Sequence, residues 1–208
     1  MSAAVRPREG WAEGFPPVEP RRASVLVLGS LPGAESIRRG EYYGHPRNAF
    51  WPIMGKLFGA GPDLSYRHRL RKLADHGVML WDVLRAAERR GSLDAAIHPR
   101  RVRANDIAGL LARHPGLERI VFNGAAAEVL FRRHVLPQCR ERLAGMRLVR
   151  LPSTSPAHAS RSFEEKLALW RQEMEGQGSG FRGRRPEASE SPGTGGRGHR
   201  TANSRNYE

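Results

Sequence analysis

Four apolar runs of this 208-residue chain each end at polar side chains that could take part in chemistry. Ser30, Asp82 and Asn123 follow the first three runs, and Ser153 and Ser155 follow the fourth. If the runs are parallel strands of one sheet, their carboxyl ends share the edge at which α/β proteins bind ligands. Hydroxyl, carboxylate and amide groups gathered in one crevice could then hold a polar ligand.

Each of these residues also has an ordinary structural interpretation. Asn123 precedes Gly124 and could form a turn or cap a helix. Taken alone, Asp82 is better explained as a cap than as a functional group. Convergence of all four strand ends is harder to explain in this way, so we predict a functional crevice at that edge.

Ser30, His158 and Asp82 are the residue types of a Ser-His-Asp hydrolase. The nucleophile elbow of such enzymes requires Gly-x-Ser-x-Gly, whereas this chain has Gly29-Ser30-Leu31-Pro32-Gly33 with no helix start after it. The sequence therefore argues against an elbow. It also contains neither a Walker pattern nor Gly-x-Gly-x-x-Gly, so a phosphate-cradling loop is not expected.

The stretch from Ser24 to Trp51 has the strongest functional signal. Its apolar run, Val25 to Leu28, is typical of a strand buried on both faces. A long polar and aromatic loop follows the glycine-proline turn, and Phe50 and Trp51 open a helix. Loops of this length are uncommon unless they are functional, so we interpret it as part of a binding site rather than a plain surface loop.

The remaining pattern alternates strands with helices. We expect strands over residues 25–28, 78–81, 119–122 and 147–151, and helices over 49–58, 65–76, 125–134 and 162–174. Asn105 or Asp106 is expected to cap a further helix that ends near His114. Residues 83–97 are expected to form a loop or short helix. The predicted fold is an α/β three-layer αβα sandwich with a central four-stranded parallel sheet.

Composition separates the two ends from the middle. We expect residues 1–23 and the Gly/Ser/Arg-rich residues 176–208 to be disordered, and residues 24–175 to form one domain. The first segment has no apolar run like that of a signal peptide. No apolar segment approaches the ~20 residues of a membrane span, so a soluble cytoplasmic protein is expected.

The formal net charge of +14 favours a polyanionic partner, nucleic acid first. The positive charge is nearly all arginine, a skew that genome composition also produces. Cys139 is the single cysteine, which excludes internal disulfides, cysteine-clustered zinc sites and four-cysteine iron–sulfur clusters. We expect no metal and no cofactor.

Several segments resemble the uracil-DNA glycosylase superfamily. GSLPG (29–33) is similar to its first motif, YYGHPRNAFW (42–51) to a segment of the mismatch-specific members, and LPSTSPAHA (151–159) to its second motif. With WDVL (81–84), GSLD (91–94) and FNG (122–124), the likeness is greatest to the hypoxanthine-DNA glycosylase branch. It covers about residues 24–172. The resemblance implies a parallel sheet between helices and hydrolysis of the N-glycosidic bond of a flipped, deaminated base, without metal or cofactor.

The resemblance also implies which residue activates the water. Many members carry an Asp or Asn in the turn after the first strand, where this chain has Ser30. Because a serine hydroxyl is short and un-ionised at neutral pH, the resemblance to the hypoxanthine branch passes this role to Asn48. Asn48 could instead cap the helix that begins near Phe50.

For base binding, the resemblance implies that Tyr43 stacks on the flipped base. Tyr42 is the rival candidate, and core packing is the ordinary interpretation. Asn123 corresponds to a strand-end asparagine that could read the base edge. The turn residues complete the predicted base-binding set: Leu31, Pro32 and Gly33.

The second motif is expected to contact DNA through Ser153, Ser155, Pro156 and Arg161. His158 is expected to favour charge build-up on the leaving base, although asparagine is more usual there and a solvated loop histidine is the alternative. No lysine lies in these motifs, so a monofunctional glycosylase without a Schiff-base step is expected.

The expected partner is single- or double-stranded DNA with a deaminated base, bound by a monomer in the cytoplasm on nucleoid DNA. Hypoxanthine is the favoured base and uracil the alternative. A second hypothesis is a non-catalytic nucleic-acid-binding module, because Ser30 stands in the usual catalytic turn.

Overall fold

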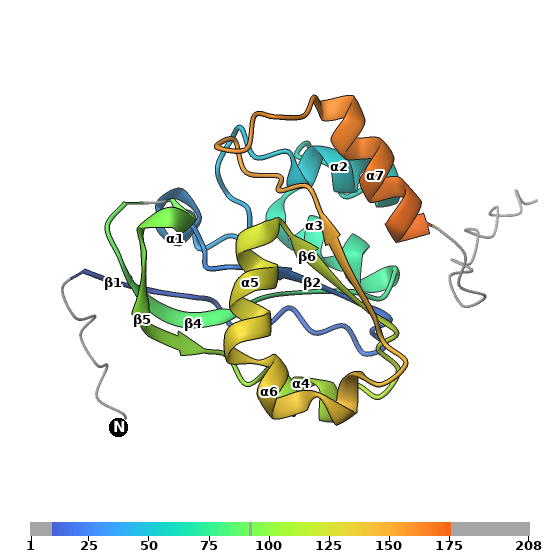
Figure 1. Cartoon of the computed structure of the whole chain (residues 1–208). Helices are drawn as coiled ribbons and strands as arrows, with labels where there is room; N and C mark the ends of the chain where they lie inside the picture. The colour runs from blue at the N-terminus through green and yellow to red at the C-terminus, as the bar shows by residue number, and fades with distance from the viewer. Residues whose placement is uncertain (1–9, 92, 176–208) are drawn as a thin grey trace, which may run out of the picture.

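A four-stranded parallel sheet forms the centre of the protein, for which a computed structural model describes residues 10–91 and 93–175 (Figure 1). The strand order is β3-β2-β6-β7. The strands are β2 (Val25–Gly29), β3 (Val78–Asp82), β6 (Arg119–Asn123) and β7 (Arg147–Leu151). All three neighbouring pairs are parallel, and every residue of β2 and β3 is buried. Continuous apolar runs form such strands because helices cover both faces of the sheet.

Helices lie on both faces of this sheet (Figure 1). One layer contains α2 (Phe50–Phe58), α3 (Tyr66–Asp75) and α7 (Phe163–Glu175). The other contains α4 (Ile107–Arg113), α5 (Ala125–His134) and α6 (Leu136–Cys139). The predicted three-layer αβα architecture is confirmed. The expected cap of α4 is present, because the Asp106 carboxylate accepts a hydrogen bond of 2.8 Å from the Gly109 amide.

A second, antiparallel sheet corrects the sequence analysis. Residues 83–97 do not form a loop or short helix, since β4 (Leu84–Arg89) pairs with β5 (Ile97–Ala104) in a hairpin. A short 3₁₀ turn, η1 (Asp94–Ala96), lies between these two strands. The strands are rich in alanine and arginine rather than β-branched residues, and their register is twice irregular, so no clean alternation marks them in the sequence.

The start of the domain also differs from the expected boundary at residue 24. β1 (Trp11–Glu13) is the third strand of the antiparallel sheet and pairs with β4. Val18 forms a bridge with Leu80, and the Trp81 indole donates a hydrogen bond of 3.1 Å to the Phe15 carbonyl. Residues 10–23 therefore belong to the fold, since they cover the edge strand β3. Residues 1–9 and the predicted tail, 176–208, lie outside the described residues.

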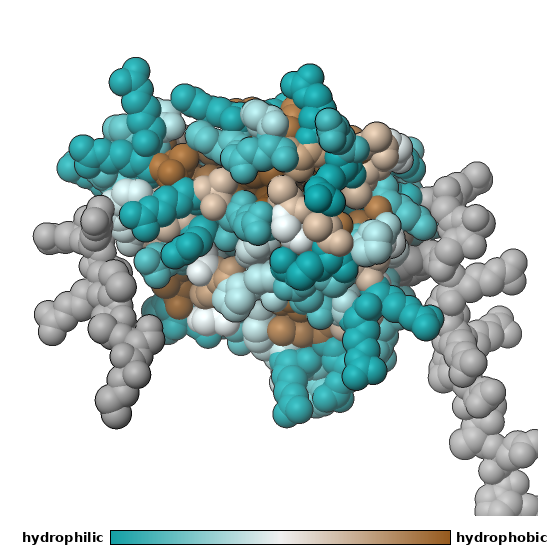
Figure 2. All heavy atoms as spheres, turned by 90° about the horizontal axis from the view of Figure 1, so that it is seen from below, coloured by the Kyte–Doolittle hydropathy of each residue, from teal (hydrophilic) through white to brown (hydrophobic). Residues whose placement is uncertain are grey.

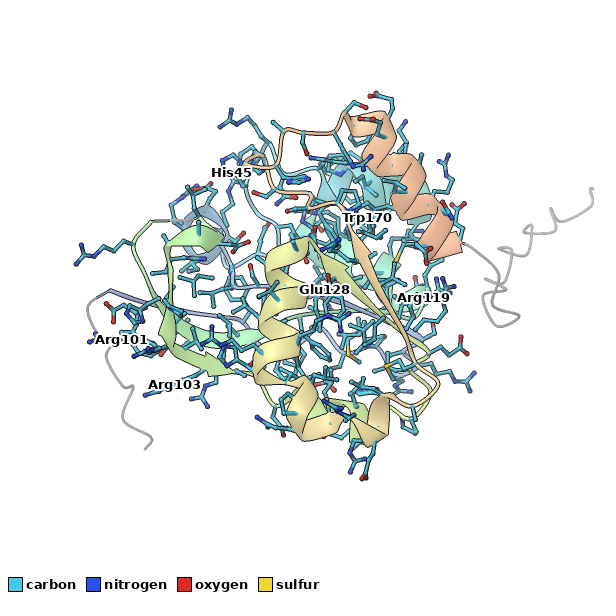
Figure 3. All side chains as sticks on the ribbon, viewed as in Figure 1. His45, Arg101, Arg103, Arg119, Glu128 and Trp170 are labelled. Carbon is cyan, nitrogen blue, oxygen red and sulfur yellow. The ribbon has the colours of Figure 1, made fainter. Side chains whose placement is uncertain are left out.

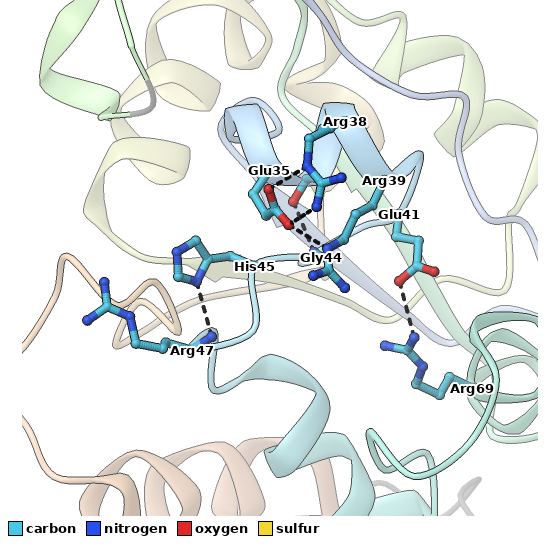
Figure 4. Close-up of polar contacts among 9 residues, drawn as sticks. Glu35, Arg38, Arg39, Glu41, Gly44, His45, Arg47 and Arg69 are labelled. Carbon is cyan, nitrogen blue, oxygen red and sulfur yellow. Dashed lines mark hydrogen bonds and ion pairs between the residues drawn. The ribbon is translucent and has the colours of Figure 1, made fainter.

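The long loop after β2 is interrupted by a short helix that the sequence analysis did not predict, α1 (Ala34–Arg39). Glu35 accepts hydrogen bonds from Arg38 and Arg39 along this helix, each at 2.6 Å (Figure 4). Gly40 ends the helix with φ of 67°, a conformation that glycine adopts without a steric penalty. The helix leaves residues 40–49 as the polar loop that leads into α2.

Seen from below, the molecule presents long hydrophilic side chains with only small apolar areas between them (Figure 2). Arg101 and Arg103 project from β5, far from His45 in the loop before α2 (Figure 3). Among residues 10–91 and 93–175, no helix has the length and apolar character needed to cross a membrane.

Candidate active site

The strand ends converge as the sequence predicts. In the sheet register Gly29 lies beside Asp82, and Asn123 lies beside Leu151, so the segments that follow all four strands leave from one edge. The loop before α2 joins the same edge, because the Ala49 amide donates a hydrogen bond of 3.0 Å to the Thr154 carbonyl. We call this edge, with the loops after β2 and β7, the crevice.

Asp82 is the most unusual group in the crevice. It is 3% exposed, and its Oδ2 atom has no hydrogen-bond partner. Burial raises the pKa of this carboxyl to about 8, with a further rise from Asp94 and an opposing effect of Arg89. At neutral pH Asp82 is therefore mainly protonated and offers one O–H donor and one acceptor.

Asp82 is not the helix cap that it would be taken for on its own. It is the last residue of β3, and its backbone carbonyl accepts a hydrogen bond of 2.8 Å from the Asn105 side chain. The carboxyl lies against Gly29, where a Cβ atom would collide with Asp82 Oδ1. Glycine at position 29 thus makes room for the acid beside the turn.

Tyr43 points a second unpartnered polar atom at this place. Its hydroxyl oxygen is buried without a hydrogen-bond partner, and a Cβ on Gly29 would lie 3.5 Å from it. Burial raises the pKa of this phenol, the nearby Asp82 adds to the rise, and Asn123 opposes it. Tyr43 has φ of 54°, rare for a bulky side chain, which is consistent with a backbone constrained for function.

The ring of Tyr43 stacks on Phe50, with ring centroids 3.9 Å apart and planes inclined by 25°. Tyr42, the rival candidate, is only 3% exposed and donates a hydrogen bond of 3.1 Å to the Pro16 carbonyl. The Trp51 indole in turn donates to the Tyr42 carbonyl at 2.9 Å. Tyr42 is therefore a core residue, and Tyr43 is the aromatic that reaches the crevice.

Asn48 supports the start of α2 without being its N-cap, because the N-cap residue of this helix is Ala49 and no side-chain cap hydrogen bond is present. Its Oδ1 atom accepts a hydrogen bond of 2.9 Å from the Phe50 amide. An amide oxygen has two lone pairs, so this contact fixes the side chain and leaves one acceptor position and the Nδ2 donors. The two roles are compatible, because a group that is held by the backbone can orient a water molecule.

The loop that carries Asn48 is itself well fixed (Figure 4). Inside the loop, His45 Nδ1 accepts a hydrogen bond of 3.1 Å from the Arg47 amide. The Gly44 amide donates to the Ser36 hydroxyl of α1 at 3.0 Å, and Arg69 of α3 pairs with Glu41 at 3.2 Å. These contacts tie the loop to two helices, so Asn48 sits on a supported backbone.

Asn123 uses its side chain to hold the loop after β7. Its Nδ2 donates to the Thr154 hydroxyl at 2.8 Å, and its Oδ1 accepts from the Thr154 amide at 2.8 Å. The following residue, Gly124, has φ of 100°, and a Cβ there would lie 2.8 Å from the Ser153 side chain. The pair makes Asn123 a link between β6 and the second motif, which leaves Asp82 as the strand-end residue with an unused polar atom.

Ser30 is likewise engaged. Its hydroxyl donates a hydrogen bond of 2.6 Å to Oδ1 of Asp94 in η1. Arg89 of β4 donates to the Pro32 carbonyl at 2.5 Å and to the Leu31 carbonyl at 3.5 Å. The hairpin thus holds the Leu31–Gly33 turn, and the sequence analysis missed Arg89 and Asp94 because both lie in a segment that it took for a loop or short helix.

The loop after β7 is held by short-range contacts. Ser153 and Ser155 accept hydrogen bonds from the amides two residues ahead, at 3.2 and 3.3 Å. Lys166 of α7 is 6% exposed and donates a hydrogen bond of 2.7 Å to the His158 carbonyl, and desolvation lowers the pKa of this lysine.

The predicted DNA-contacting residues of this loop lie at or near its surface. The His158 ring is half-buried and lies 3.2 Å from the Ser160 hydroxyl. Pro156 is half-buried and Arg161 is exposed. No group of three or more His, Cys, Asp or Glu side chains in the described residues is placed to hold a metal ion.

The side chains at the crevice indicate a class of protein. A buried acid, an aromatic ring and amides held by hydrogen bonds, gathered at the carboxyl edge of a parallel sheet, are suited to binding a polar organic ligand. The positive charge of the chain points to a nucleic acid as that ligand.

Comparison with known proteins gives the same answer in more detail. The model of the uracil DNA glycosylase superfamily matches residues 16–174. Two proteins named hypoxanthine DNA glycosylase are similar to the chain. The one from Methanosarcina barkeri is 40% identical over 113 residues, 54% of this chain and 70% of the relative. The one from Methanosarcina acetivorans is 42% identical over 115 residues, 55% of this chain and 72% of the relative.

A solved structure supports the match. The solution NMR structure of a Methanosarcina acetivorans protein described as a candidate uracil DNA glycosylase superposes with a TM-score of 0.61. That protein is 36% identical, and the match covers 79% of this chain and 99% of its own. This chain belongs to the uracil DNA glycosylase superfamily, so the resemblance found in the sequence is confirmed.

Proposed function

We propose that this chain is a monofunctional DNA glycosylase that extrudes a deaminated base from DNA and hydrolyses its N-glycosidic bond, with hypoxanthine as the main base. Family membership makes DNA the substrate and the N-glycosidic bond the point of attack. The choice of hypoxanthine is supported by the two relatives that carry that name.

One observation carries the proposal at the level of chemistry. Two buried polar atoms without partners, Asp82 Oδ2 and the Tyr43 hydroxyl, lie around Gly29 at the crevice. Buried polar atoms normally have hydrogen-bond partners. Two such atoms without a partner at the edge where α/β proteins bind ligands indicate that a bound ligand supplies the missing hydrogen bonds.

Hypoxanthine suits this pair. Its six-membered ring presents a carbonyl oxygen that accepts a hydrogen bond and an adjacent N–H that donates one. A protonated carboxyl can donate to the carbonyl oxygen and accept from the N–H. In this proposal Asp82 reads the edge of the flipped base and Asn123 positions the loop after β7. Uracil also presents a carbonyl beside an N–H, so uracil remains the alternative substrate.

The remaining groups have complementary roles in the proposed reaction. Asn48 orients the attacking water against C1′ of the sugar, where oxocarbenium character develops. Tyr43 lies beside the base, with Phe50 supporting its other face. Ser153, Ser155, Pro156 and Arg161 contact the DNA, and His158 favours charge build-up on the leaving base.

Leaving-group stabilisation has a simple form in this scheme. As the glycosidic bond breaks, electron density moves onto the base, and a neutral donor at the base edge strengthens its hydrogen bond. An ionised carboxylate would oppose that charge, so burial of Asp82 serves the reaction by keeping the acid protonated. The chain is proposed to act as a monomer in the cytoplasm on nucleoid DNA.

The test is incubation of the full chain with oligonucleotides that each contain one hypoxanthine, uracil or xanthine, followed by alkali. Excision leaves an abasic site that alkali cleaves, and the largest single-turnover rate identifies the base. Asn48→Ala is the control against a contaminating glycosylase. A chain that shifts the oligonucleotides in a gel but yields no cleavage would be a binding module instead.

A further inference from the structure

We propose that the outer side of α3 binds the phosphate backbone of the duplex that flanks the extruded base. This surface is formed by Arg67, Arg71 and Lys72, and we call it the α3 face. The inference rests on the proposed function, because it gives the DNA substrate a second contact surface beside the crevice. Phosphate contacts position a duplex and add affinity without reading its sequence.

The unbalanced charge of α3 is the first observation. Arg67, Arg71 and Lys72 are exposed, and none of them forms an ion pair with a residue in 10–91 or 93–175. In α1, by contrast, the exposed Arg38 pairs with Glu35 at 2.6 Å. The α3 face therefore presents three cations to solvent without an acid beside them.

The order of the charges along α3 is the second observation, because it does not stabilise the helix. Arg67 and Arg71 lie four residues apart on one side of the helix, a spacing at which like charges repel each other. The first turn contains Arg67 and no acidic residue, although the N-terminal end of a helix favours negative charge. Asp75, the one acidic residue of α3, stands at the opposite end. Local rules are broken in this way at functional sites, so the α3 face is a candidate for binding an anion.

Arg69 shows which part of the basic character of α3 is structural. Its side chain is 12% exposed, lies over the Trp51 ring at 4.7 Å and pairs with Glu41 at 3.2 Å (Figure 4). Arg67 and Arg71 are each two residues from Arg69, about 200° around the helix axis. They therefore lie on the side of α3 that is turned away from these packing contacts, and their charge is not needed to hold the helix in place.

The N-terminal end of α3 adjoins the loop that leads into the crevice. The Tyr42 amide donates a hydrogen bond of 3.0 Å to the hydroxyl of Tyr66, the first residue of α3. Asn48 belongs to the same loop. A duplex with one base in the crevice would continue past the first turn of α3, where Arg67 lies, and Arg71 follows one helical turn farther, about 6 Å along the axis.

Duplex DNA is the occupant that the α3 face favours. Cations without an acid complement a polyanion, and the superfamily to which the chain belongs acts on DNA. Residues 67–75 contain no Phe, Trp or Tyr on which an unpaired base could stack. The face therefore suits the backbone of a paired duplex better than the bases of a single strand.

The experiment measures the binding of the full chain to a long undamaged duplex at several salt concentrations, by fluorescence anisotropy. The variant is Arg67→Gln/Arg71→Gln, since glutamine keeps helix propensity. The slope of log K against log salt should become shallower by about 1.8, at ~0.9 for each lost phosphate contact. The matched control is Arg133→Gln/Arg140→Gln, which removes the same charge from the layer of α5 and α6. Both control arginines are exposed and form no ion pair with a described residue, and their loss should change the slope little.

Further arms separate the α3 face from other roles. Arg67→Lys/Arg71→Lys should keep most of the slope, because a phosphate contact needs the charge. An unchanged slope in the glutamine variant would overturn the proposal and leave an acidic protein as the partner of this face. An equal change in the control would also overturn it, since net charge alone would explain the effect. On an inosine duplex with arms of only a few base pairs, the glutamine variant should bind like the wild type, and a loss of the same size there would refute contact with the flanking duplex. A wild type that binds DNA but excises no base would instead overturn the proposed function.

Discussion

Replacing Asp82 by asparagine tests whether a neutral acid reads the base. The side chain keeps its size, its donor and its acceptor, but it can no longer ionise. In the wild type, burial raises the pKa of Asp82 from 3.8 to about 8. Single-turnover excision by the wild type should therefore fall as pH rises through about 8, whereas the asparagine variant should keep its rate at that pH.

The pH dependence of the free energy of unfolding tests the same pKa independently, and its sign follows from the direction of the pKa shift. Because the folded-state pKa is raised, the contribution of Asp82 is fully present below pH 3.8 and is lost as pH rises through about 8. The difference between the two values corresponds to a ceiling of roughly 6 kcal/mol. The part of this change that falls between pH 5 and pH 8 has a ceiling of roughly 4 kcal/mol, ~1.4 kcal/mol for each pH unit.

The assay is urea unfolding of the wild type and Asp82→Asn at pH 5 and pH 8.5. Relative to the wild type, the free energy of unfolding of the variant should rise by up to about 4 kcal/mol between these two pH values. Asp82→Leu separates packing from hydrogen bonding, since it fills the space but lacks both polar atoms, and it should lose excision at every pH. Parallel pH profiles of the wild type and Asp82→Asn, in both rate and stability, would refute an acid that titrates near pH 8.

Three further predictions concern the rest of the chain. Asn48→Ala should reduce single-turnover excision by ~10²-fold with DNA binding retained, and Ser30→Ala should cost much less. Near wild-type excision by folded Asn48→Ala would leave Asn48 only its contact with the Phe50 amide at the start of α2. Residues 10–175 should fold and excise without the two ends, whereas a chain starting at residue 24 should unfold at lower urea because β1 and the Val18 bridge are lost; equal midpoints would contradict this. Chelator treatment should leave excision unchanged, and an activity-linked metal found by elemental analysis would overturn that expectation.

The central sheet could be predicted because its strands are continuous apolar runs. Val25 to Leu28 and Val78 to Trp81 have few alternatives to burial on both faces, and strands that alternate with helices form parallel sheets. The convergence of polar groups followed from topology alone. The helix caps were equally local, as the Asp106 contact with Gly109 shows.

The hairpin and the N-terminal strand could not be predicted in this way. β4 and β5 pair through alanine and arginine, whose strand propensity is low, so their stability comes from tertiary packing. β1 has only three residues, and it is recognisable as a strand only through its pairing with β4. Local sequence does not encode such long-range pairing, and the domain boundary was placed too late for the same reason.

The hydrogen-bond partners of the site residues also could not be predicted from the sequence. Ser30 bonds to a residue 64 positions away, and Asn123 bonds to one 31 positions away. Sequence analysis can assign such residues to the crevice but cannot tell which of them are already satisfied. The Asn123 side chain has hydrogen-bond partners and Asp82 Oδ2 has none, which is why we propose Asp82 as the residue that reads the base.

The hairpin of β4 and β5 contacts both the turn after β2 and the surroundings of Asp82. Arg89 and Asp94 bring opposite charges to the turn after β2, and both influence the pKa of Asp82, Arg89 lowering it and Asp94 raising it. The same two residues hold the turn after β2, Asp94 through the Ser30 hydroxyl and Arg89 through the Pro32 carbonyl. The contacts that close the hairpin on this turn therefore hold its backbone and set the charge environment of Asp82 together, so the shape of the turn and the proposed reading of the base would depend on one element.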